Sequence, residues 1–121
     1  EGRARWEAMT DAIVEQEPVL REIVRRLVQA FHPERIYLFG SRARGGDGPD
    51  SDYDLLVVVN ELPKPAYRLE QQAHGLLCDL GVAADILFWS KDDFEWRAGW
   101  RSSLPATVLR EGMVLHAVRA V

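Results

Sequence analysis

The order of the predicted elements is typical of an α/β (α+β) protein in which helices pack against one sheet. Three observations support this prediction. Apolar residues recur at the helical period near the N-terminus, short β-branched and aromatic runs follow, and helical and strand patterns then alternate. A hydrophobic share of 47% beside 28% charged residues fits a globular protein, and 121 residues predict a single domain over 1–121.

The first half of the chain is predicted to hold one helix and two strands. The helix covers 18–31, where an apolar stripe includes Leu20, Ile23 and Leu27, and His32-Pro33 ends it. A strand follows over 36–39 and closes at Gly40. After a glycine-rich loop, the strand 53–59 is apolar on both faces, so we expect it in the centre of the sheet.

The second half is predicted to continue this alternation. A helix over 66–80 ends at Gly81, and a strand follows over 82–89. Ser90 and Asp93 resemble a capping box that opens a short helix ending at Trp100. The last predicted elements are a helix over 104–110, a cap at Gly112 and an edge strand over 113–115.

Composition narrows the class of function. The net charge of −4 disfavours binding to a nucleic-acid backbone, and no apolar run reaches the length of a membrane span. The first six residues do not resemble a secretory signal, and the single cysteine, Cys78, cannot form an internal disulfide. We therefore expect a cytoplasmic protein that binds neither membrane nor nucleic acid.

Acidic residues next to predicted strands form a candidate metal site. Asp52 and Asp54 are two residues apart at a predicted strand, so their side chains project from the same face, about 6.6 Å apart along the chain. Two carboxylates at that spacing repel each other unless a cation lies between them, and their hard oxygens suit Mg²⁺ or Mn²⁺. Asp85 lies in an apolar run, where a lone carboxylate is costly. If the strands are neighbours, it completes a three-carboxylate site.

A candidate phosphate site precedes these acids. Gly40 allows a phosphate to approach the backbone, and Ser41 adds a hydroxyl donor. Arg42 and Arg44 can offset the charge of a triphosphate, and the sequence does not decide between them. A phosphate-binding loop beside carboxylates that can bind a metal predicts a nucleotide–metal site.

The two candidate sites together resemble a known signature. Gly40-Ser41, ten intervening residues and Asp52-x-Asp54 resemble the GS-x10-D-x-D motif of the DNA-polymerase-β-like nucleotidyltransferase superfamily. The stretch IYLFGSRARG with SDYDLLVVV is similar to the minimal antitoxin-type members paired with HEPN toxins. Each motif alone is a weak signal, whereas the pair at this spacing is a strong one. The resemblance is densest over 33–59 and extends more loosely over nearly the whole chain.

The resemblance implies a nucleotidyltransferase fold with a mixed sheet flanked by helices, and two-metal nucleotidyl transfer from ATP. It implies that Asp52 and Asp54 bind both Mg²⁺ ions and that Asp85 binds the catalytic metal and helps deprotonate the acceptor. It also implies that Gly40, Ser41 and Arg42 or Arg44 hold the phosphates. Such metals stabilise the attacking and the leaving oxygens of an in-line displacement.

The resemblance further implies an acceptor, the tyrosine hydroxyl of a partner HEPN toxin, so that the chain is an adenylylating antitoxin. Two alternatives stay open: a non-catalytic antitoxin that only binds its partner, and a small-molecule nucleotidyltransferase with a separate acceptor-binding subunit. The preferred base, the number of nucleotides transferred and the existence of a homo-oligomer are also open.

Several other residues have simpler interpretations. We expect Cys78 to be a small core residue, and Trp89, Trp96 and Trp100 to pack in the core, with a partner-binding surface as the alternative. The three histidines lack metal-site spacing, so we expect them to be structural or at the surface. The arginines of 21–26 are expected on a solvated helix face.

Overall fold

The computed structural model describes residues 18–40 and 53–118. Ser41, Arg42, Arg44 and Asp52 lie outside these ranges, so their predicted roles have no structural description here. The elements in chain order are α2 (Pro18–Phe31), β1 (Arg35–Phe39), β2 (Tyr53–Val59), α3 (Tyr67–Leu77), the 3-10 helix η1 (Cys78–Leu80), β3 (Ala84–Ser90), α4 (Lys91–Ala98), α5 (Leu104–Glu111) and β4 (Met113–Ala117).

The four strands form one mixed sheet in the order β3-β2-β1-β4. β1 pairs antiparallel with both β2 and β4, whereas β2 pairs parallel with β3. The parallel pair is possible because α3 carries the chain back between β2 and β3. The prediction that residues 53–59 form a central strand is confirmed, and so is the edge position of the last strand.

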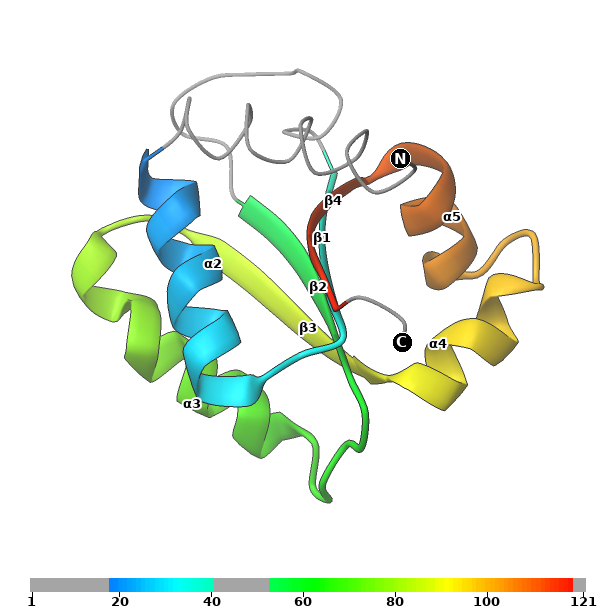
Figure 1. Cartoon of the computed structure of the whole chain (residues 1–121), viewed down its shortest axis with the longest axis horizontal. Coiled ribbons are helices and arrows are strands. Elements are labelled where there is room, and N and C mark those ends of the chain that lie inside the picture. The colour runs from blue at the N-terminus through cyan, green and yellow to red at the C-terminus, as the bar shows by residue number, and fades with distance from the viewer. Residues whose placement is uncertain (1–17, 41–52, 119–121) are drawn as a thin grey trace.

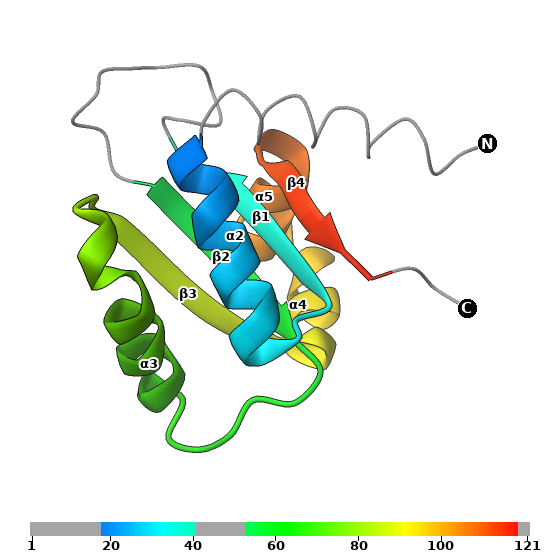
Figure 2. The same cartoon turned by 60° about the vertical axis from the view of Figure 1, so that its left-hand side comes forward.

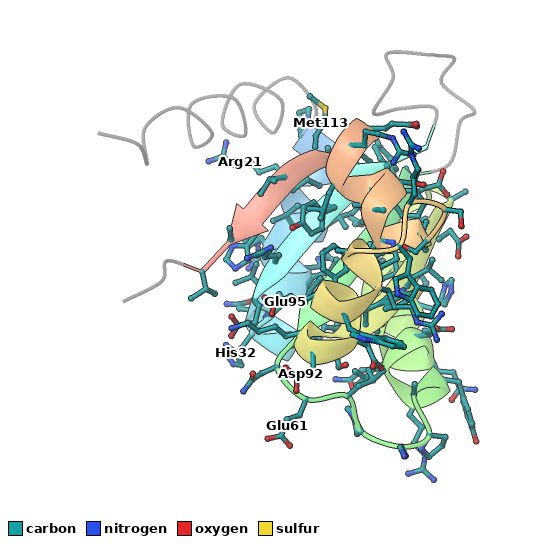
Figure 3. The ribbon with its side chains drawn as sticks, turned by 90° about the vertical axis from the view of Figure 1, so that its right-hand side faces the viewer. Arg21, His32, Glu61, Asp92, Glu95 and Met113 are labelled. Atoms are coloured by element: carbon teal, nitrogen blue, oxygen red, sulfur yellow. The ribbon has the colours of Figure 1, made fainter. Side chains whose placement is uncertain are left out.

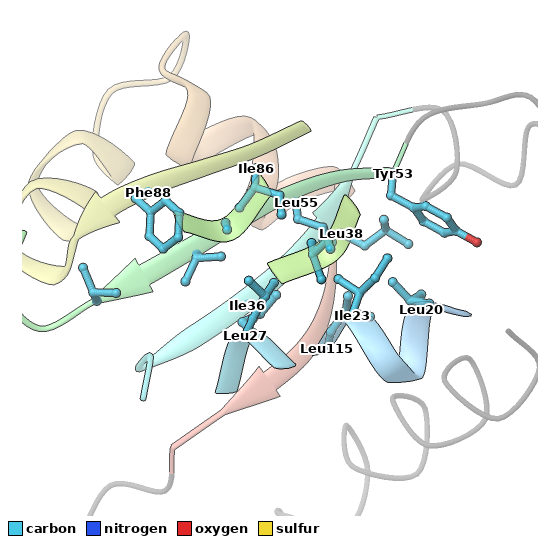
Figure 4. Packing of buried hydrophobic residues seen from close by; sticks show 14 residues of the cluster. Leu20, Ile23, Leu27, Ile36, Leu38, Tyr53, Leu55, Ile86, Phe88 and Leu115 are labelled. Atoms are coloured by element: carbon cyan, nitrogen blue, oxygen red, sulfur yellow. The ribbon is translucent and has the colours of Figure 1, made fainter. Parts of the chain in front are cut away.

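Helices cover both faces of the sheet (Figures 1 and 2). On one face, α2 and α3 bury their apolar stripes against alternate residues of the strands. The residues that α2 buries are Leu20, Ile23 and Leu27, and Figure 4 shows them beside Ile36 and Leu55 of the sheet. On the other face a smaller core joins α4 and α5 to the sheet, made of Tyr37, Leu56, Val58, Phe94 and Val108. The fold is therefore a three-layer α/β arrangement.

The predicted element ends need small corrections. The helix expected over 66–80 is α-helical only from Tyr67 to Leu77 and then tightens into η1, which ends at Gly81 in a left-handed conformation (φ 68°). The strand expected from residue 82 begins at Ala84. Ser90 caps α4 as predicted, since its side chain accepts a hydrogen bond from the Asp93 N–H, and α4 ends at Ala98 rather than Trp100.

Two predictions of burial are wrong. Cys78 is exposed because Ala73 and Leu77 define the buried stripe of α3, and the residue after Leu77 points away from it. Trp96 and Trp100 are 61% and 49% exposed because Phe94 is the residue that α4 buries, Trp96 lies on another side of the helix, and Trp100 comes after its end. Trp89, in contrast, packs partly buried against the smaller core, as predicted.

Within residues 18–40 and 53–118, no helix combines the length and the apolar character needed to cross a membrane.

Candidate functional site

Two of the predicted acidic residues lie side by side at one end of the sheet. Asp54 of β2 and Asp85 of β3 are Cα partners in the parallel pairing, so their strands are about 4.8 Å apart at this point. Tyr53, Leu55 and Ile86, their neighbours in sequence, all face the α2/α3 core. By alternation, both carboxylates project from the opposite face, the one that α4 and α5 cover.

Gly40 brings the chain directly after β1 against Asp54. It follows Phe39, which is the Cα partner of Asp54, and it has a positive φ of 78°. A Cβ atom at this position would lie only 2.2 Å from Asp54 Oδ2. The backbone and the carboxylate are therefore in a contact that a side chain would not allow. Gly40 therefore lies next to Asp54, whereas the functional roles predicted for Gly40, Asp54 and Asp85 stay predictions.

The structure corrects the reason given for Asp85. We expected a carboxylate within an apolar run to need a partner because of burial, but Asp85 is exposed as the second residue of the edge strand β3. Asp54 is half-buried. The proximity of the two residues follows from strand pairing. The described residues contain no group of three potential metal ligands, and Asp52, the third predicted acid, lies outside them.

The donor set fits a hard divalent cation. Two carboxylates on paired positions of adjacent strands provide the oxygen ligands that such an ion prefers. Their mutual repulsion falls when a cation binds between them. Asp54 and Asp85 would therefore hold Mg²⁺, together with Asp52 if the alternation expected from the sequence continues.

A cleft of about 370 Å³ lies next to Asp85 and was not predicted from the sequence. The described residues around it come from the end of α3 and from the approach to β3, and they are His74, Leu77, Cys78, Val82, Ala83, Ala84 and Asp85. Hydrophobic periodicity identifies the core-facing side of α3, but it gives no signal for which flank of a helix borders an opening. His74 is exposed, which is one of the two positions expected for the histidines, structural or at the surface.

The largest described pKa shifts lie elsewhere. Hydrogen bonds from Arg25 and Arg26 lower the pKa of Glu22 to about 2, and Arg26 also lowers the pKa of Asp79. These residues form ion pairs on the outer side of α2 and at η1, away from the acidic pair. They stabilise the contact between helices and take no part in the candidate site.

Comparison with known proteins supports the predicted resemblance. The model of the nucleotidyltransferase domain family matches residues 19–111. The protein adenylyltransferase MntA of Thermococcus cleftensis is 31% identical over 97 residues, which cover 80% of this chain and 89% of MntA. The protein MJ0604 of Methanocaldococcus jannaschii is 31% identical over 103 residues, which cover 84% of this chain and 98% of that protein.

A solved structure shows the same fold. A toxin–antitoxin crystal structure with AMP-PNP superposes on this chain with a TM-score of 0.55 at 23% identity, covering 81% of this chain and 73% of the other. The mixed sheet, the spacing of the glycine and the acidic residues, and the match over residues 19–111 lead to one assignment. The chain belongs to the nucleotidyltransferase domain family.

Proposed function

We propose that this chain transfers AMP from ATP to a tyrosine hydroxyl of a partner HEPN-domain toxin and so acts as its antitoxin. Family membership supports nucleotidyl transfer, and the relative from Thermococcus cleftensis is named as a protein adenylyltransferase. The observation that carries the proposal is the contact of Gly40 with the Asp54 carboxylate, beside Asp85 on the next strand. This arrangement provides a phosphate approach and two acidic ligands within one site.

Each residue has a proposed role. Gly40 and Ser41 would donate hydrogen bonds to the β- and γ-phosphates, and Arg42 or Arg44 would neutralise their charge. Asp52, Asp54 and Asp85 would bind metal, and Asp85 would also take the proton of the acceptor hydroxyl. The exposure of Asp85 supports this second role, since a protein acceptor has to reach it from solvent.

Mg²⁺ held by these carboxylates would supply charge stabilisation at the phosphate where the transfer occurs. The chain itself would orient the nucleotide and keep the acceptor oxygen in line with the bond to pyrophosphate. The strand pairing of Asp54 with Asp85 fixes the separation of two ligands before any substrate binds. Such preorganisation is the contribution that we expect from the sheet.

AMP transfer to an HEPN-domain protein from the same genome tests the proposal. With ATP labelled at the α-phosphate and Mg²⁺, we expect the label on one or more tyrosines of the partner, identified by mass spectrometry. Asp54→Asn and Asp85→Asn should each lower the rate by about 100-fold or more. Asp92→Asn is the matched control, because Asp92 is an exposed acid in the first turn of α4, and its rate should be unchanged.

The same variants separate the alternatives. If Asp54→Asn removes transfer but still protects cells from the partner at full strength, the chain inhibits by binding alone. If the partner receives no AMP while a small molecule does, the acceptor is not a protein. Either result would contradict the proposed function.

A further inference from the structure

Two exposed tryptophans and an arginine form an aromatic patch at the end of α4. The side chains of Trp96 and Trp100 are 61% and 49% exposed, and their ring centroids lie 4.7 Å apart. The Arg97 guanidinium carbon lies 5.7 Å from the Trp96 ring centroid and 5.2 Å from that of Trp100. We define Trp96, Arg97 and Trp100 as the indole patch.

The indole patch is not needed to form the core. Phe94 is the residue that α4 buries, with 1% exposure, and it stacks on Tyr37 with the ring centroids 5.4 Å apart. An indole ring that stays exposed to water does not contribute the favourable free energy of burial to folding. Tryptophan and arginine are also the residues most enriched among those that dominate binding energy at protein interfaces.

The backbone holds the indole patch in place before any partner arrives. The Trp100 N–H donates to the Arg97 carbonyl at 2.9 Å, and the Ser103 N–H donates to the Trp100 carbonyl at 2.9 Å. The Ser103 hydroxyl also donates to the Arg97 carbonyl. A surface that is already ordered loses little conformational entropy on binding, which favours affinity.

Charge indicates the chemistry of the partner. Among the described residues, neither Arg97 nor the nearby Arg101 forms an ion pair. Figure 3 shows Glu95, on the same helix, at the side of α4 that lies toward β1. There its charge adds to the effect of the Tyr37 hydrogen bond in raising the pKa of Arg35. The indole patch therefore presents apolar rings beside cationic groups that form no ion pair within residues 18–40 and 53–118, which is complementary to an apolar protein surface with carboxylates.

The position of the indole patch links it to the candidate site. α4 covers the sheet face from which Asp54 and Asp85 project, and it starts directly after β3. β3 extends from Ala84 to Ser90, about 20 Å at the usual rise per residue. A standard protein interface buries about 800 Å² on each partner, which corresponds to roughly 30 Å across. An interface of that width is larger than the length of β3, the strand that leads from Asp85 to the start of α4.

We propose that the indole patch is a docking surface for the acceptor protein, which binds it through apolar side chains bordered by carboxylates. The identity of that protein rests on the proposed function, whereas the docking chemistry rests on the indole patch itself. A nucleic acid is a poorer match because its continuous row of phosphates would meet a chain with a net charge of −4, whereas a protein surface needs only a few carboxylates next to Arg97 and Arg101.

The test measures binding and transfer separately with the double variant Trp96→Ala/Trp100→Ala. Calorimetry with the HEPN-domain protein should show affinity reduced by about 30-fold or more. In AMP transfer, KM for this protein should rise by a similar factor while kcat stays within about 2-fold, and transfer to a short peptide carrying the acceptor tyrosine should not change. Tyr67→Ala is the matched control, since Tyr67 is 55% exposed on α3, on the opposite face of the sheet. This variant should leave both the affinity for the HEPN-domain protein and the KM for it unchanged.

A second variant tests the charge and does not depend on removing the aromatic rings. Arg97→Glu/Arg101→Glu should weaken binding further at low salt than at high salt, because it opposes the carboxylates of the partner. Stronger or unchanged binding would overturn the proposed partner chemistry. Equal losses with protein and peptide would also overturn the inference, because they would show a role in shaping the site.

Three other outcomes are decisive. Loss of single-stranded RNA binding in the tryptophan variant, with no loss of protein binding, would assign the indole patch to nucleic acid. Dissociation of a wild-type dimer by the same variant, again with partner binding intact, would assign it to self-association. If the partner binds through the indole patch but receives no AMP, the docking inference stands and the proposed function fails.

Discussion

Gly40 shows how a single residue can connect a backbone turn to an acidic site. Its φ of 78° lies in the left-handed region, which side chains other than glycine adopt at a cost. Its Cα hydrogen also occupies the place where a Cβ would collide with the Asp54 carboxylate. Conformation and close approach therefore both require glycine, and the second requirement concerns the candidate site directly.

Gly40→Ala should reduce both stability and AMP transfer. The left-handed backbone alone should cost about 1–2 kcal/mol in the free energy of unfolding. Displacement of the Asp54 carboxylate should lower transfer by about 100-fold, as measured by label incorporation with saturating Mg²⁺-ATP. Gly75→Ala is the control, because no atom lies within 4 Å of its Cβ position in α3. It should stabilise the fold by about 0.5–1 kcal/mol and leave transfer unchanged. Normal transfer by Gly40→Ala would separate this glycine from the site.

At the scale of elements, Arg26 connects α2 to the end of α3 and to η1. It donates to Glu22 one turn earlier at 2.7 Å, to Asp79 of η1 at 2.6 Å and to the Leu76 carbonyl at 2.7 Å. The arginines of this helix were expected to be solvated, which describes Arg25 but not Arg26, whose side chain is 23% exposed. Arg26 and Asp79 are 53 positions apart, and a contact at that separation does not affect the local hydrophobic periodicity. The sequence therefore could not predict it.

This network predicts a dependence of stability on acid. Arg25 and Arg26 lower the pKa of Glu22 from 4.5 to about 2, and Arg26 lowers that of Asp79. Since both carboxyl groups bind protons more readily in the unfolded chain, the network stabilises the fold above about pH 4.5. Its contribution decreases as the pH falls towards 2.

Thermal unfolding from pH 5.5 to pH 2.5 checks this dependence. Arg26→Gln should be less stable than wild type at pH 5.5, and the difference should shrink as the pH falls. Arg21→Gln, on the same helix and outside the network, should show the same change of stability with pH as wild type. Burial lowers the pKa of His116, but His116 is common to all three proteins and cancels in the difference. If the difference in stability between Arg26→Gln and wild type stays constant with pH, the electrostatic explanation is wrong.

The junction of α4 and α5 depends on Ser103. Its hydroxyl accepts from the Ala106 N–H at 3.2 Å, which caps α5, and donates to the Arg97 carbonyl near the end of α4. Ser103→Ala should lower the free energy of unfolding by about 1 kcal/mol, measured by urea denaturation. Ser102→Ala, an exposed neighbour outside the cap, should have no effect. If both variants behave alike, the cap does not stabilise this junction.

For the whole molecule, the sequence was most informative where a pattern repeats. The stripe of α2 and the apolar β2 were predicted because burial on one or both faces dictates which residues occur there. The pairing of Asp54 with Asp85 was expected only if the strands were neighbours, since register depends on the whole sheet. The exposure of Trp96 was not predictable from residue type, because only the position of Phe94 determines which side of α4 faces the core. The predicted roles of Ser41, Arg42, Arg44 and Asp52 stay predictions.

Binding of Mg²⁺ and nucleotide should stabilise the molecule as a whole. A ligand that binds only the folded state at 100 times its Kd adds about 2.7 kcal/mol, which for a chain of this size raises Tm by roughly 10 °C. We expect this increase in differential scanning fluorimetry with Mg²⁺ and a non-hydrolysable ATP analogue together, and a much smaller one with the nucleotide and EDTA. Asp54→Asn should remove most of the increase, whereas Asp92→Asn should retain it. An equal rise in EDTA would show that the nucleotide binds without the cation, and the acidic pair on β2 and β3 would then need a different role.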